Sequence, residues 1–380
     1  MATMSSILKM FFEIFGKVLF ALISFLVLLF LFSLFFIALG LGVGIGIGGN
    51  GLTEIVEPDQ LAYHYISGNQ MSENRLLSIP IQGVILGSMP PNIPPAALFG
   101  GGVTYGYAVQ EVLEKAARDD SIKGVFLHMQ TPGGTIFGSY AIFEGLKMYK
   151  DVTGKPVVVY IEGLSASGGV MAMVGADEIY ADYGSIIGSI GILGPQLMYY
   201  DTPVAMDGGL FNSGIVTEGG IEHTILFAGK GKDLGDPFRR ISDEELQHWQ
   251  KGLENEYALF VQHVADNRNI EETVIREQMG AHVFDNQTAQ EFGLIDGTLN
   301  KKAALAELAR LADVSEDFQL VRPKSESNQF LAQLLQGWYQ VSGNAEQSHR
   351  LHQSMIRQDM CQATAHVALV YYGDLMALCR

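Results

Sequence analysis

The stretch GVFLHMQTPGG occupies residues 124–134, and the stretch PVVVYIEGLSASGG occupies residues 156–169. Each begins with a short apolar run of the kind that forms a buried strand, and each ends in small residues that favour a turn or a helix start. Between them, the segment from Tyr140 to Tyr149 is expected to be a helix. Strands that alternate with helices predict an α/β fold with a largely parallel sheet.

The neighbouring sequence continues this alternation in both directions. We expect strands at residues 76–85 and 178–181, and a helix over residues 109–116, where apolar residues recur at helical spacing. Ser242 followed by Glu245 is a capping-box pattern, which predicts a helix that begins there.

Two glycine segments follow predicted strands, at the position where α/β sheets form their sites. They are Thr131–Gly134 and Ser165–Gly169. Taken singly, the first would be a tight turn and the second a helix start with a serine near the cap. Because they coincide at the ends of successive strands, we expect a site in which a serine hydroxyl lies beside bare backbone N–H groups.

A lysine further along the chain is the candidate general base, because a neutral lysine can replace histidine in activating a serine. Lys232 lies in a Gly-Lys-Asp segment, and Lys230 is its rival. A lysine ordinarily titrates near a pKa of about 10.4 and must be desolvated to act as a neutral base. The alternative for either residue is a solvated loop lysine.

Histidine is the weaker candidate for the base. No histidine occurs between Ser167 and His223, and His128 lies within a predicted strand, where we expect a buried, hydrogen-bonded core residue. The other histidines lack metal-ligand spacing. The sequence therefore predicts no metal and no cofactor.

A membrane anchor is predicted near the N-terminus. Residues 18–47 form a run of 30 residues without a charge, whereas a bilayer core needs about 20 apolar residues. The alternative is a cleaved secretory signal, whose apolar region is usually only about 7–15 residues long. Lys9 and Lys17 precede the run and acidic residues follow it. Because basic residues favour the cytoplasmic side of a membrane span, this charge distribution predicts that the short N-terminus lies in the cytoplasm and the bulk of the chain lies outside.

Composition excludes several classes of function. The chain has 24 basic and 41 acidic residues, for a net charge of −17, which argues against binding nucleic acid or anionic lipid headgroups. Its only cysteines are Cys361 and Cys379. The main domain therefore contains neither a disulfide nor a cysteine metal cluster. The sequence does not decide whether the two cysteines of the tail form a disulfide.

These motifs together resemble the signal peptide peptidase A proteins, in the serine–lysine peptidase family S49 that shares the Clp protease/crotonase fold. The resemblance covers roughly residues 75–312. The segments that carry it are the strand Ile79–Ile85, Lys115–Asp120, Ile122–Gly124, Thr131–Gly134, Ser165–Gly169, Gly188–Gly191, Gly231–Asp233 with Pro237, and Gly293–Asp296.

The resemblance implies a role for each site residue. Ser167 matches the family's nucleophile, Lys232 its general base, and Ser189 a serine that helps to orient the lysine. The backbone N–H of Gly168 and one from Gly133 or Gly134 would then form the oxyanion hole. The family usually has two tyrosines after the Ser-Gly-Gly motif, where this chain has Val170-Met171, so the shape of the substrate pocket is not carried over.

The resemblance also implies an assembly and a location. Family members with one catalytic domain form rings in which the serine and the lysine come from adjoining protomers, so we expect a homo-oligomer, specifically an octamer on the membrane. Its substrates would be hydrophobic peptides such as remnant signal peptides, cut through an acyl-enzyme. The catalytic domain would lie on the periplasmic side of a bacterial inner membrane.

The expected domain order is an anchor over residues 1–47, a stalk over 48–75, a peptidase domain over 76–312, and a helical tail over 313–380. An extra hairpin is expected between Ser189 and Lys232. Two alternative functions remain, a crotonase-type acyl-CoA enzyme and a catalytically silent membrane scaffold. The acyl-CoA enzyme would need neither the Ser167 and Lys232 pair nor an anchor.

Overall fold

The computed structural model describes residues 17, 19–20, 23–32, 61–89, 102–195, 197, 199, 224–315, 317–324, 361 and 369–373. The chain divides into two compact units, Met1–Glu57 and Pro58–Arg380. In the first unit, residues 23–32 are helical and their apolar side chains are exposed. None of the helices within the described residues is long and apolar enough to cross a bilayer. Most of the predicted anchor, residues 18–47, lies outside the described residues.

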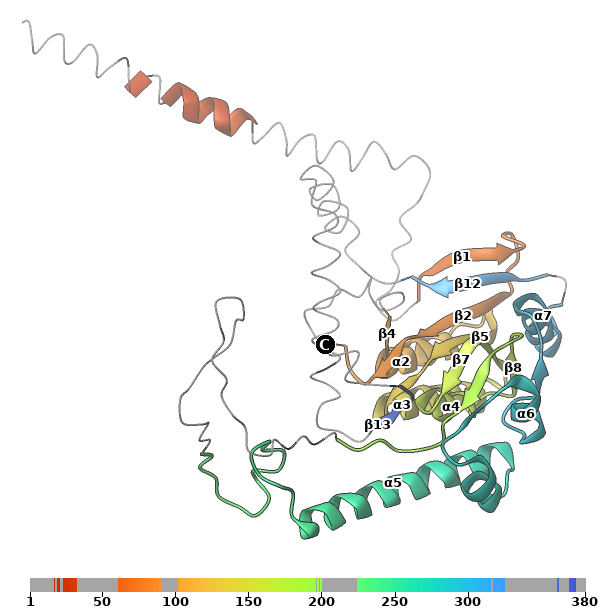
Figure 1. Ribbon diagram of the computed structural model, residues 1–380. Coiled ribbons are helices and arrows are strands. Elements are labelled where there is room, and N and C mark those ends of the chain that lie inside the picture. Colours follow the sequence, from red (N-terminus) through yellow and green to blue (C-terminus); the bar gives the residue numbers. More distant parts are fainter. Residues whose placement is uncertain are drawn as a thin grey trace, which may run out of the picture. The chain divides into compact units, whose positions relative to one another are not determined.

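The second unit is built on a mixed, mostly parallel sheet (Figure 1). Its strands follow the order β1-β12-β2-β5-β7-β8-β11, and β9 pairs with both β7 and β10. The pairs β1/β12 and β10/β9 are antiparallel, and the others are parallel. The strands are β1 (Tyr63–Gly68), β2 (Arg75–Gln82), β5 (Ile122–Thr131), β7 (Val157–Ala166), β8 (Glu178–Ala181), β9 (Ile186–Gly188), β10 (Val283–Phe284), β11 (Gly297–Thr298) and β12 (Gln319–Pro323). The predicted α/β class is confirmed.

A second, smaller sheet has the order β13-β6-β3-β4. Its strands are β3 (Val84–Leu86), β4 (Val103–Tyr105), β6 (Gly133–Thr135) and β13 (Leu369–Tyr371). The single strand expected over residues 76–85 is split between the two sheets at Gly83. This residue has a φ of 67°, and a Cβ there would lie 1.8 Å from the carbonyl oxygen of Gly102. Only glycine therefore fits at this corner.

Helices cover both faces of the main sheet (Figure 1). Alternate side chains of β2, β5 and β7 pack on one face against α2, α3 and α4, and the intervening side chains pack on the other face against α7. The helical elements are α2 (Gly106–Ala117), α3 (Ile136–Thr153), α4 (Gly168–Met173), α5 (Asp243–Arg268), a π-helical turn (Val274–Met279), α6 (Asn286–Glu291) and α7 (Lys301–Leu311).

Two sequence predictions are confirmed in detail. Ser242 is the N-cap of α5, and its side chain and that of Glu245 form the complete capping box. His128 is a buried strand residue, and its Nε2 atom lies 2.5 Å from Oε2 of Glu162. Burial is the first cause that lowers the pKa of His128, and the charge of Lys301 adds to it.

The ends of the folded unit differ from expectation. β1 falls inside the range expected to be a stalk, residues 48–75, and pairs with β12 at the edge of the main sheet. Its side chains are almost all exposed, so it lacks the apolar alternation that would predict a strand. The tail expected to be helical, residues 313–380, supplies strands β12 and β13. Most of the predicted helical tail and most of the predicted extra hairpin lie outside the described residues.

Candidate active site

Ser167 occupies a sharp strand-to-helix junction between β7 and α4. Its φ of 55° and ψ of −110° place it in a region that residues other than glycine rarely adopt. The backbone N–H of Ser167 donates to the carbonyl of Gly188 (2.7 Å), and the N–H of Met171 donates to the carbonyl of Ser167 (3.0 Å). Such a conformation costs about 1–3 kcal/mol and persists where the surroundings enforce it, which is characteristic of functional positions.

The hydroxyl of Ser167 is buried without a partner. The residue is 0% exposed, and its Oγ atom makes no hydrogen bond with any described residue. A buried polar atom left unpaired costs about 1–3 kcal/mol, and such an atom in a native structure calls for an explanation. The role of nucleophile predicted from the sequence would supply one, and it stays a prediction at this point.

Ser189 lies next to Ser167 at the ends of adjacent parallel strands. Ala166 on β7 pairs with Gly188 on β9, so the residues that follow them, Ser167 and Ser189, are neighbours. Ser189 is 7% exposed and also has a positive φ, 60°. Its N–H donates to the carbonyl of His282 (2.6 Å), which holds this second serine in place.

Two of the glycines predicted to form the oxyanion hole, Gly133 and Gly168, lie close to each other and to the carbonyl oxygen of Val370. An added Cβ on Gly133 would lie 2.6 Å from the backbone nitrogen of Gly168 and 2.1 Å from the carbonyl oxygen of Val370. A Cβ on Gly168 would lie 2.9 Å from that same oxygen. The two glycines therefore face each other across a space that is large enough for a carbonyl oxygen but too small for a side chain.

That space belongs to a slot that β13 fills. On one side β13 pairs antiparallel with β6, with Val370 opposite Gly134. On the other side, Leu193 and Leu369 exchange both backbone hydrogen bonds, at 2.8 and 2.9 Å. An extended segment of the tail thus lies between β6 and the segment that follows Ser189. Main-chain pairing on both edges therefore holds β13 in this slot.

The backbone N–H groups of Gly133 and Gly134 have different surroundings. The N–H of Gly133 donates to Oγ1 of Thr131 (3.0 Å), and the Thr131 hydroxyl in turn donates to the carbonyl of Gly83 (2.6 Å). Gly134 lies within β6, opposite Val370 of the strand in the slot. The sequence left the choice between Gly133 and Gly134 open, and this geometry favours Gly134 as the donor that faces the slot.

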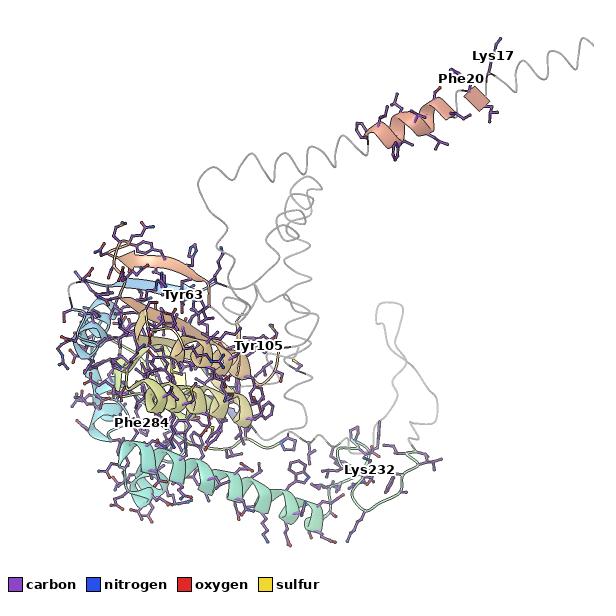
Figure 2. All side chains as sticks on the ribbon, turned by 180° about the vertical axis from the view of Figure 1, so that it is seen from behind. Lys17, Phe20, Tyr63, Tyr105, Lys232 and Phe284 are labelled. Atoms are coloured by element: carbon purple, nitrogen blue, oxygen red, sulfur yellow. The ribbon has the colours of Figure 1, made fainter. Side chains whose placement is uncertain are left out.

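Lys232 is remote from Ser167 in the same chain. It is exposed in the loop before α5, and Figure 2 shows it beyond the N-terminal end of that helix, apart from the strands. α5 contacts α4 through His263, whose Nε2 donates to the carbonyl of Met171 (2.9 Å). From Glu245 to His263 the helix rises by about 27 Å, which is far longer than a lysine side chain. The structure thus brings Ser167, Ser189, Gly133, Gly134 and Gly168 together and leaves Lys232 outside.

The neighbours of Lys232 distinguish it from its rival. Lys230 forms an ion pair with Glu244 (2.5 Å). Asp233 is held by Arg239 at 2.6 and 2.9 Å. The Lys232 amine makes no hydrogen bond or ion pair with any residue in the described part of the chain. Among the two lysines, Lys232 is therefore the one available to another molecule.

The burial of His263 predicts that the stability of the protein depends on pH. Burial lowers the pKa of His263 below its ordinary value of 6.5, so the folded state favours the neutral ring. This stabilisation is complete above about pH 6.5 and is lost as the pH falls below it. We expect the free energy of unfolding, measured in urea, to fall between about pH 7 and pH 5. In the variant His263→Gln, the free energy of unfolding should fall less steeply with decreasing pH. His128, whose pKa burial also lowers, contributes equally in both proteins, and parallel curves would contradict this role for His263.

Some features escaped sequence reasoning. The three-residue strand β13 has no pattern of its own, and the ion pairs of Arg239 join residues that the sequence does not mark as partners.

Among the described residues, no group of three or more histidine, cysteine, aspartate or glutamate side chains is placed to hold a metal ion. Cys361 is disulfide-bonded, and Cys379 lies outside the described residues.

Comparisons with known proteins show that part of the chain is similar to peptidases. The profile of peptidase family S49 matches residues 150–315. A candidate protease from Methanocaldococcus jannaschii is 35% identical over 204 residues, which cover 54% of this chain and 61% of that protein. A candidate signal peptide peptidase SppA from Enterococcus faecium is 27% identical over 223 residues, which cover 59% of this chain and 60% of that protein.

Among solved structures, a ClpP1 mutant from Listeria monocytogenes aligns with a TM-score of 0.36 and 11% identity, covering 60% of this chain and 94% of that chain. The chain spans about three fifths of the length of the two curated relatives. The segment that the family profile matches contains Ser167, Ser189 and Lys232. Within residues 150–315, the chain is therefore similar to peptidase family S49.

Proposed function

We propose that this protein is a serine peptidase in which Ser167 attacks a peptide carbonyl and Lys232 accepts the serine proton. The observation that carries the proposal is the buried, unpaired Oγ of Ser167 in a strained junction, beside a slot that takes an extended strand. The match of residues 150–315 to the model of peptidase family S49 supports the serine–lysine assignment.

The steps follow from the groups at the site. The neutral amine of Lys232 takes the proton of Ser167, and Oγ forms a bond to the substrate carbonyl carbon. The N–H groups of Gly168 and Gly134 stabilise the negative oxygen of the tetrahedral intermediate. The C–N bond then breaks, and the proton passes from the lysine to the leaving amine. Water, activated by the same lysine, releases the acyl group by the reverse sequence.

Ser189 has a supporting role in this proposal. It lies beside Ser167 and is nearly buried. Its hydroxyl would accept a hydrogen bond from the incoming ammonium or donate one to the neutral amine. Either bond would orient the nitrogen of Lys232 towards Ser167 in an environment dry enough to favour its neutral form.

The lysine is proposed to come from a second copy of the chain. About 27 Å of α5 separates the cap at Glu245 from the contact of His263 with α4, so one chain alone does not complete the site. A ring in which each copy lends its lysine to the next would complete every site. We propose that this ring is an octamer.

The substrate class follows from the slot and its occupant. Leu369 and Val370 are apolar, buried and held by main-chain pairing. Extended hydrophobic peptides, such as remnant signal peptides, have the same chemistry. We further propose that residues 18–47 anchor the protein in a bacterial inner membrane, with the catalytic unit on the periplasmic side. The exposed apolar side chains of residues 23–32 support an anchor there.

A hydrolysis assay with an apolar peptide library tests this function. The full-length chain should cleave the peptides, and a chain ending at Lys324 should show a KM that is several-fold lower, because β13 no longer fills the slot. Thermal unfolding of the shortened chain serves as the control for folding. Turnover of an acyl-CoA thioester without any peptide cleavage would contradict the proposal and favour a crotonase-type enzyme.

A further inference from the structure

Arg239 lies at the centre of a charged cluster in the loop that carries Lys232. Its guanidinium donates twice to Asp233, at 2.6 and 2.9 Å, and twice to Glu245, at 2.7 and 2.9 Å. A fifth bond goes to the carbonyl of Arg240 (3.1 Å). A guanidinium has five N–H donors, so every donor of Arg239 is used.

The cluster joins the lysine loop to the first turn of α5. Glu245 also accepts from the backbone N–H and the hydroxyl of Ser242, at 3.0 and 2.9 Å. The side chains of Asp233 and Glu245 are only 13% and 15% exposed. Hydrogen bonds from Arg239 are the first cause that lowers the pKa of the Asp233 carboxyl, and they lower the pKa of Glu245 to about 2. Both carboxylates therefore stay charged and bound to Arg239 around neutral pH.

Asp233 would otherwise oppose the chemistry of its neighbour. A carboxylate close to an amine favours the protonated form of that amine, whereas a general base has to be neutral. Two bonds to one guanidinium fix both carboxylate oxygens of Asp233. This pairing offsets the negative charge directly beside Lys232 in the sequence.

Other charged side chains close to Lys232 in the sequence also have partners. The titratable side chains on this loop and on the first turn of α5 are Lys230, Asp233, Asp236, Arg239, Arg240, Asp243, Glu244 and Glu245. Glu244 pairs with Lys230, and the guanidinium of Arg240 stacks on the ring of Tyr199 at 4.5 Å. Asp233, Glu244 and Glu245 each have a basic partner other than Lys232.

We propose that Arg239 is a positioning residue for the general base: it binds Asp233 so that the carboxylate does not pair with the amine of Lys232, and it fixes the lysine loop to α5. The inference rests on the proposed serine–lysine chemistry, and it adds a residue that acts through another and does not touch the substrate.

The pH dependence of kcat/KM for peptide hydrolysis by the full-length chain tests this role. In Arg239→Gln, Asp233 is released and holds the proton on the lysine. The acidic limb of the profile should therefore move up by about one pH unit, which lowers the rate about tenfold at neutral pH. The rate should recover at alkaline pH. The double variant Arg239→Gln/Asp233→Asn should return the limb to its original position.

Two further variants separate positioning from folding. Arg310→Gln removes an arginine that pairs with Glu307 on α7, and it should leave the profile unchanged. Glu245→Gln weakens the attachment to α5 but leaves Arg239 on Asp233, so it should lower thermal stability with little shift of the limb.

The outcomes distinguish this role from the proposed function. If Lys232→Ala is as active as the unaltered chain, the dyad fails and the role of Arg239 fails with it. If activity depends on Lys232 but Arg239→Gln lowers the rate equally at every pH, the dyad stands and the positioning role is overturned. A shifted limb that Asp233→Asn does not restore would overturn it as well.

Discussion

Replacing Ser167 by alanine is expected to abolish peptide hydrolysis while leaving the protein folded and as stable as before. Loss of the nucleophile in a serine peptidase costs on the order of 10⁶ in kcat. The hydroxyl of Ser167 makes no hydrogen bond with any described residue. Removing this hydroxyl therefore breaks no hydrogen bond and leaves no other polar group unpaired. The measurements are the hydrolysis rate and the free energy of unfolding.

Ser185 provides the matched control. It is also buried, but its Oγ accepts from the N–H of Gly163 (3.1 Å) and donates to the carbonyl of Ile161 (3.3 Å). Ser185→Ala should therefore lose about 1 kcal/mol or more of stability and keep its activity. If Ser167→Ala cleaves peptides at the original rate, Ser167 is not the nucleophile. If it is destabilised as much as Ser185→Ala, its hydroxyl has a structural partner.

Mixing two inactive variants is expected to restore activity. Ser167→Ala supplies an intact lysine, and Lys232→Ala supplies an intact serine. If each site takes its serine from one copy and its lysine from the next, about a quarter of the sites in a randomly mixed ring contain both. If the site forms within one chain, no site in the mixture contains both. The measurement is the hydrolysis rate of the co-assembled mixture, compared with each variant alone.

A second mixture makes this test quantitative. Equal amounts of the unaltered chain and the double variant Ser167→Ala/Lys232→Ala should give about a quarter of the original rate if the sites are shared, and about half if they are not. Differently tagged chains verify that the copies have co-assembled. Co-assembled particles in which the two single variants remain inactive would contradict a shared site.

The sequence predicts the parts of this fold that depend on local pattern. The buried strands and the helices packed on them have apolar spacing that matches their structure, and Ser242 with Glu245 marks the start of α5. The glycines of the site are predictable because close backbone approach excludes a side chain at Gly133 and Gly168. Ser167 and Ser189 are neighbours because their strands are parallel partners.

The remainder depends on contacts between distant residues. β1 is an exposed edge strand without apolar alternation, and β13 is a strand only because β6 and Leu193 pair with it. The sequence places Lys232 before α5, but only the contact of His263 with α4 reveals how far the loop lies from Ser167. The pairing of Arg239 with Asp233 is a matter of side-chain direction, which spacing along the chain does not determine.

Covalent labelling tests the central claim, that Ser167 is a nucleophile activated by Lys232, most directly. The full-length chain is treated with a fluorophosphonate, which reacts with activated serines, and the modified residue is located by mass spectrometry of its peptides. We expect a single label on Ser167 and a strongly reduced rate of labelling in Lys232→Ala. An unlabelled Ser167 in protein that still cleaves peptides, or equal labelling without Lys232, would contradict the claim.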